Sequence, residues 1–143
     1  MRFMVIVKAS PDSEAGVLPT PDEFETMGKF NEELVDAGVL LAADGLQSSA
    51  KGARIYFDGD KRTVVDGPFA ETKELIAGFW LVEMNSLEEC VEWFRRCPCP
   101  SPAGETNIEI RRVFEAEDFG ENFTPERQEA VEELRARAAA QHS

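Results

Sequence analysis

The chain has 143 residues, a length that suits one domain with a short extension. Its formal net charge of −13 argues against direct binding to phosphate backbones or anionic membranes, and its 43% hydrophobic content argues against a disordered chain. No apolar run reaches the ~18 residues of a membrane-spanning helix, and residues 1–8 lack a signal peptide's apolar core, so we expect a cytoplasmic location.

The first third of the chain predicts a strand, a helix and a second strand. Residues 3–8 are a compact run of β-formers, followed by a polar loop over residues 9–18. A helix begins at Thr20-Pro21, where Thr20 can cap and Pro21 suits the first helical position. Its helical spacing is carried by Phe24, Met27, Phe30 or Asn31, and Leu34. Residues 39–43 predict the second strand, and residues 44–52 a loop.

The middle of the chain predicts a β-hairpin and the most apolar strand. Residues 53–57 and 62–65 flank Asp58-Gly59-Asp60, which is hairpin-turn chemistry. Residues 76–83, IAGFWLVE, are almost continuously apolar, so we expect this strand in the centre of the sheet.

The last part of the chain predicts a helix, a strand and a tail. The helix begins at Asn85-Ser86 and is broken at Cys97-Pro98. Its inner face is predicted to carry Leu87, Cys90, Val91 and Phe94. Residues 107–114 alternate as a strand, residues 119–123 predict a linker, and Thr124-Pro125 caps a final helix. We expect Val131 and Leu134 to anchor that helix.

Without the hairpin, the elements follow the order βαββαβ, so we expect an α+β, ferredoxin-like domain over residues 1–115 and a linker with a helical tail over residues 116–143. Two helices bury one stripe each on a single sheet face, which leaves the opposite face uncovered. That apolar face, with Phe79, Trp80 and Leu81 as its main contributors, predicts a homodimer.

Familiar catalytic and metal-binding patterns are absent from the sequence. There is no G-x-S-x-G, P-loop or G-x-G-x-x-G, and the single histidine, His142, is too close to the C-terminus to be held as a general base. Cys90, Cys97 and Cys99 lack the spacing of a zinc site or a redox C-x-x-C pair. We therefore expect reduced thiols, no metal and no cofactor.

The densest group of polar residues lies between the hairpin and the central strand, over residues 66–74. Asp66, Gly67 and Pro68 have the composition of a turn, and a structural role is favoured for them over a functional one. Phe69 is expected either to anchor this loop in the core or to line a cleft. Glu71 and Lys73 either face a ligand or are solvated, and from spacing alone the solvated interpretation is favoured.

The stretch DGPFAETKELIAGFWLVE, residues 66–83, resembles the signature of the DGPF-type, YCII-related protein family. The segments RFMVIVKAS, AGVLLAADGLQ and NIEIRRVFE fit the same family, so the resemblance covers roughly residues 1–115. The matching positions are Asp66, Gly67, Pro68, Phe69, Glu71, Lys73 and Gly78, with Asp44, Gly45 and Leu46 as a shorter second motif. The resemblance implies a ferredoxin-like dimeric α/β barrel, with a cleft between helix-free sheet faces and nearby loops.

The function of that family is mostly unassigned. Some relatives are lyases or dehydrochlorinases that use a His-Asp pair, a mechanism that does not carry over to a chain whose one histidine is His142. The resemblance also implies a link, through a protein contact, to an extracytoplasmic-function sigma factor.

Three functions are therefore open. The first is a dimeric module that binds a small ligand or a sigma factor through the loop at residues 66–74 and the end of the second strand. The second is a histidine-independent lyase or isomerase on a small organic acid or aromatic, with Asp66 or Asp44 as base and Glu71 or Lys73 orienting the substrate. The third is a structural interaction protein that uses its tail helix.

Overall fold

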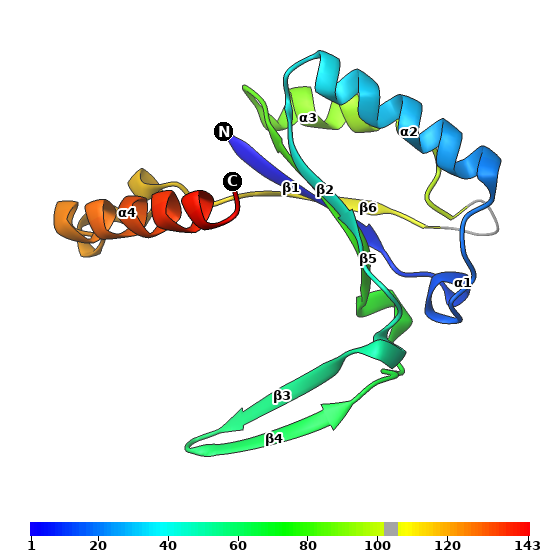
Figure 1. Ribbon diagram of the computed structural model, residues 1–143, viewed down its shortest axis with the longest axis horizontal. Coiled ribbons are helices and arrows are strands. Elements are labelled where there is room, and N and C mark those ends of the chain that lie inside the picture. The colour runs from blue at the N-terminus through cyan, green and yellow to red at the C-terminus, as the bar shows by residue number, and fades with distance from the viewer. Residues whose placement is uncertain (102–105) are drawn as a thin grey trace. The chain divides into compact units, whose positions relative to one another are not determined.

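The protein is described here by a computed structural model, in which residues 1–101 and 106–143 are defined (Figure 1). The chain divides into two compact units, Met1–Arg112 and Val113–Ser143. Among the helices of the described residues, none combines the length and apolar character needed to cross a membrane.

The first unit contains a four-stranded antiparallel sheet with strand order β2-β5-β1-β6, and a separate two-stranded hairpin. The sheet strands are β1 (Arg2–Lys8), β2 (Leu40–Gly45), β5 (Ile76–Glu83) and β6 (Ile108–Arg112). The hairpin strands are β3 (Ala53–Asp58) and β4 (Lys61–Asp66). The helices are α1 (Pro11–Glu14), α2 (Pro21–Asp36) and α3 (Leu87–Phe94), with short 3-10 turns η1 (Ser49–Lys51) and η2 (Thr72–Glu74).

Apart from the hairpin and the short α1, η1 and η2, the first unit contains β1, α2, β2, β5, α3 and β6, which is the βαββαβ order of the ferredoxin-like fold. The predicted α+β, ferredoxin-like class is confirmed, and β5 is a central strand as its apolar sequence predicted. Figure 1 shows α2 and α3 on the same side of the sheet.

The core lies between this side of the sheet and the two helices. Phe30 and Leu34 of α2, and Cys90 and Phe94 of α3, pack against Phe3, Val5, Trp80 and Val82 of the strands. The rings of Trp80 and Phe94 lie 5.2 Å apart, and those of Phe30 and Phe94 5.5 Å apart. The indole nitrogen of Trp80 donates a hydrogen bond of 2.7 Å to Asn31, so its one polar atom is satisfied.

The side of the sheet opposite α2 and α3, which we call the bare face, carries Met4, Ile6, Ala42, Phe79 and Leu81. Antiparallel partners share a face, and the pairs Met4–Leu81, Ile6–Phe79 and Ala42–Leu81 alternate with the core pair Val5–Trp80. The expectation that Trp80 contributes to the uncovered face was therefore wrong. Trp80 is 5% exposed among the core residues, because successive strand residues point to opposite sides.

The helices bury fewer residues than their sequence patterns predicted. Phe24 is 62% exposed on α2, and Leu87 and Val91 are 48% and 39% exposed on α3. The helix α3 has only eight residues and is capped at Arg95, two residues before Cys97. Its buried stripe is reduced to Cys90 and Phe94, which lie one turn apart.

The second unit contains η3 (Ala116–Asn122) and α4 (Pro125–Gln141). The predicted linker at residues 119–123 belongs to η3 up to Asn122, with a non-helical backbone at Gly120, and Phe123 follows the element. One stacked and one edge-to-face ring pair join this segment. Phe114 and Phe119 lie 4.6 Å apart, and Phe119 and Phe123 5.3 Å apart. Thr124 caps α4 as predicted, but Leu134 is 58% exposed and does not anchor it.

Candidate functional site

The segment that joins the hairpin to the central strand, residues 66–75, is called the DGPF loop here. It begins at Asp66, the last residue of β4, and contains a cis peptide bond between Gly67 and Pro68. A side-chain carbon at Gly67 would overlap the backbone carbonyl oxygen of Ser49. Glycine is therefore required at the point where the loop packs against η1.

A serine and a glutamate, both missed in the sequence, hold the start of this loop. The Ser49 hydroxyl accepts a hydrogen bond of 3.0 Å from the backbone N–H of Phe69 and donates one to the Glu14 carboxylate. The backbone N–H of Ser49 donates to the second oxygen of that carboxylate at 2.9 Å. Glu14 is half-buried at the end of α1, so one carboxylate fixes η1, which in turn fixes the loop.

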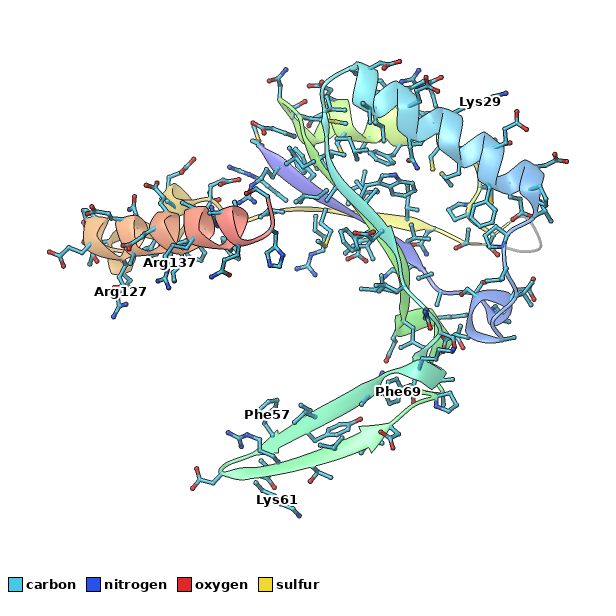
Figure 2. All side chains as sticks on the ribbon, viewed as in Figure 1. Lys29, Phe57, Lys61, Phe69, Arg127 and Arg137 are labelled. Carbon is cyan, nitrogen blue, oxygen red and sulfur yellow. The ribbon has the colours of Figure 1, made fainter. Side chains whose placement is uncertain are left out.

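The aromatic ring of the loop is held by the hairpin. The Arg54 guanidinium lies 3.9 Å from the centre of the Phe69 ring, and the Gly67 N–H donates to the Gly52 carbonyl at 3.0 Å. Phe69 is half-buried and outside the hydrophobic core cluster, which leaves part of its ring accessible. Figure 2 shows Phe69 at the base of the hairpin.

The two motif segments meet between β2 and β5. The Leu46 N–H donates to the Ala77 carbonyl at 2.8 Å, and a side-chain carbon on Gly78 would lie 2.9 Å from the Asp44 carbonyl oxygen. The prediction that Asp44 and Gly45 lie in a loop was wrong, because β2 continues through both residues by pairing with Phe79 and Gly78. Asp44, as the partner of Phe79, lies on the bare face.

Charged groups flank the apolar residues of the bare face. The ammonium of Lys8 on β1 lies 3.3 Å from the carboxylate of Glu109 on β6. Glu109 is the strand partner of Ile6, which places this ion pair beside the apolar residues. Asp44 lies at the other edge of the sheet, on β2. The face therefore combines an apolar centre with charges of both signs at its sides.

The remaining predicted site residues, Asp66, Pro68, Glu71 and Lys73, are exposed. Glu71 precedes η2 without capping it, and Lys73 lies within that turn. Within residues 1–101 and 106–143, the side chains of Asp66, Glu71 and Lys73 form no hydrogen bond or ion pair with one another. They remain available to contact something other than their own fold.

Other chemistry is sparse in the described part of the chain. No group of three or more metal-ligating side chains is found in it, and His142 caps the end of α4 in the second unit. Burial raises the pKa of Cys90 to about 11, with a smaller contribution from Glu89, and burial and Cys99 raise the pKa of Cys97 to about 11. An open depression on α3 is lined by Glu89, Glu92, Trp93, Arg95 and Arg96, none of which belongs to the DGPF loop.

The fold and the two joined motifs define the chain as a ferredoxin-like α+β protein with its characteristic loop at the entry to the central strand. The YCII-related domain family matches residues 1–117, and the chain belongs to that family. The resemblance of the DGPF signature is thereby confirmed.

Two individual proteins were also compared. An uncharacterized protein of Rhizobium meliloti (strain 1021) is 35% identical over 77 residues, which are 54% of this chain and 62% of the relative's length. The chain thus matches less than two thirds of that relative. The solved structure of 5-chloro-2-hydroxyhydroquinone dehydrochlorinase from Burkholderia phenoliruptrix AC1100, in complex with 2,5-dihydroxybenzoquinone, is 16% identical, with a TM-score of 0.46 over 82% of this chain and 98% of that chain. At that score, the likeness decides neither fold nor activity.

Proposed function

We propose that the protein is a homodimeric module that binds a small organic molecule between the bare face and the DGPF loop. The observation that carries this proposal is the bare face itself. It presents the apolar side chains of Phe79 and Leu81 on the side of the sheet opposite α2 and α3. Apolar sheet faces are normally covered, and a second copy supplies a surface of the same kind.

The dimer encloses a site of defined chemistry. The half-buried residues Met4, Phe79 and Leu81 supply apolar contact, and Asp44 and Lys8 supply polar groups at the sides. Such a surface suits a small aromatic or organic acid, whose apolar body meets the sheet while its polar group meets a charge. Pro68 and Phe69 of the loop shape the entrance, and Glu71 and Lys73 reach the polar group.

Thermal shift with small aromatic acids, such as benzoate and salicylate, tests the ligand. Lys73→Ala removes an exposed cation from the DGPF loop, and Lys61→Ala is the matched control because Lys61 is an exposed cation at the hairpin tip. We expect the acids to raise the Tm of the wild type and of Lys61→Ala, and to lose that effect in Lys73→Ala. The same shift in both variants, or none in the wild type, would contradict the proposed site.

A second candidate function, a histidine-independent lyase or isomerase, is supported by the position of Asp44. Its carboxylate belongs to the bare face beside Phe79, where a bound organic acid would lie, whereas Asp66 ends a hairpin strand. Asp44→Asn is expected to abolish turnover and Asp66→Asn to leave it unchanged, measured by product formation from the acids that bind. Turnover that survives in Asp44→Asn removes Asp44 as the base.

The link to an extracytoplasmic-function sigma factor stays a prediction. Such a contact would have to be made by protein surfaces, because the chain carries a formal charge of −13 and repels DNA. Co-purification of a tagged full-length chain with the sigma factor tests it, and a sigma factor that elutes separately would remove it.

A further inference from the structure

The hairpin of β3 and β4 is an incomplete sheet. Ile55, Phe57 and Val64 are 56%, 70% and 64% exposed on one of its faces, and Tyr56 and Val65 are exposed on the other. A two-stranded ribbon is marginal in water, and strands added at its edge stabilise it because their side chains pack beside its apolar side chains along each face. The ribbon seen in Figures 1 and 2 therefore calls for further strands beside it.

The backbone hydrogen-bonding groups of β4 that face away from β3 lie at known positions. The Gly67 N–H donates to the Gly52 carbonyl, so this pair is hydrogen-bonded, and antiparallel alternation makes every second residue of β4 point inward to β3. The backbone groups of Arg62, Val64 and Asp66 therefore point away from β3. In the described sheet topology no strand lies beside this edge of β4.

We propose that two copies of the chain pair through this edge, β4 against β4, to form a four-stranded antiparallel ribbon with two-fold symmetry. A two-fold axis through the Val64 pair sets Val64 opposite Val64 of the second copy, and Arg62 opposite Asp66 of the second copy. Both pairs join residues whose backbone groups point outward, so each outward N–H meets an outward carbonyl of the other copy.

Charge and packing select this register. If the second copy is shifted by two residues in one direction, Asp60 of one copy lies opposite Asp66 of the other. If it is shifted in the other direction, Asp66 lies opposite Val64. Both shifts remove the Arg62–Asp66 ion pair. In the proposed register, Ile55 and Val64 of the two copies form one continuous apolar row across the ribbon. In its own chain the Arg62 guanidinium lies 4.5 Å from the centre of the Phe57 ring and donates to the Gly59 and Lys61 carbonyls. In the proposed register the same side chain also faces the Asp66 carboxylate of the second copy.

Cysteine cross-linking tests the pairing, in a Cys97→Ser, Cys99→Ser background that keeps only the buried Cys90. The two Val64 Cα atoms would lie about 5.5 Å apart, within the range of a disulfide. Ile55→Cys is the matched control, because Ile55 is similarly exposed on the same face. In the proposed ribbon the two Ile55 residues are separated by three strand spacings, about 14 Å, which is too far for a disulfide. We expect mild oxidation to convert most of Val64→Cys to a covalent dimer, and Ile55→Cys to remain uncross-linked.

Two further outcomes would overturn the proposal. Equal cross-linking of Val64→Cys and Ile55→Cys would indicate random collision, and cross-linking of Tyr56→Cys in preference to Val64→Cys would assign the contact to the β3 edge. Failure of Val64→Cys to cross-link would also overturn it. None of these results bears on the bare face, because Val64 and Ile55 belong to the separate hairpin sheet.

Discussion

At the scale of single residues, Ser49 connects segments that are distant in the chain. Its hydroxyl is hydrogen-bonded to both Phe69 and Glu14, which lie 20 and 35 residues away in the chain. No local pattern predicts such a contact, because Glu14 and Ser49 both lie in segments with the composition of loops. The DGPF motif was visible in the sequence, whereas the residues that hold it were not.

Ser49→Ala should lower the free energy of unfolding by about 1–3 kcal/mol, because it leaves the Phe69 N–H and the half-buried Glu14 carboxylate with fewer partners. Ser48→Ala is the control, since the neighbouring Ser48 is similarly half-buried and its side chain caps nothing. Chemical denaturation measures both variants. Equal stability of the two would show that the Ser49 bridge contributes nothing.

The raised pKa values of Cys90 and Cys97, from 9.0 to about 11, predict a pH-dependent stability. Above pH 9 the unfolded thiols ionise while the folded thiols stay protonated, so the unfolded state binds fewer protons. Their contribution to stability is complete below pH 9 and is lost as the pH rises toward 11.

Iodoacetamide labelling at pH 8.5, followed by mass spectrometry, should modify exposed Cys99 well before Cys90 or Cys97. Cys90 labelled as fast as Cys99 would contradict this assignment.

At the scale of elements, strand type and order followed from local composition, whereas several element ends did not. The bounds of β5, Ile76–Glu83, agree with the prediction. The end of β2 was missed because Asp44 and Gly45 are polar-loop residues by composition and enter the strand only through pairing with β5. Local propensity is overridden in this way where a partner strand supplies hydrogen bonds.

The approach of the DGPF loop to η1 makes a prediction at this scale. Gly67→Ala should destabilise the protein by about 1–3 kcal/mol, because the added carbon meets backbone that cannot rotate away. Gly28→Ala, inside α2, is the matched control, with open space around the added carbon and an expected gain of about 0.5–1 kcal/mol. Thermal unfolding of both variants would show opposite signs. A neutral Gly67→Ala would mean that the loop does not pack on η1.

At the scale of the whole molecule, no helix or strand among the described residues of the first unit packs on the bare face or beside the outer edge of β4. The bare face was predicted from the order of the elements, because two helices in a βαββαβ arrangement lie on one side of the sheet. Its residues could not all be assigned, since the sequence does not show which side Trp80 takes. Asp44 and the Lys8–Glu109 pair could be assigned to the sides of this face only from the strand register, which the sequence does not give.

The mass of the protein in solution tests most directly whether the bare face meets a second copy. The proposed β4–β4 pairing would also raise the mass, so sedimentation equilibrium is measured on the variant Val64→Pro. This substitution removes the outward N–H of residue 64, which the β4–β4 pairing needs. We predict a dimer of twice 15.9 kDa, which Leu81→Asp on the bare face converts to a folded monomer while Val91→Asp on α3 leaves it intact. A Val64→Pro protein that sediments as a folded monomer would contradict the account.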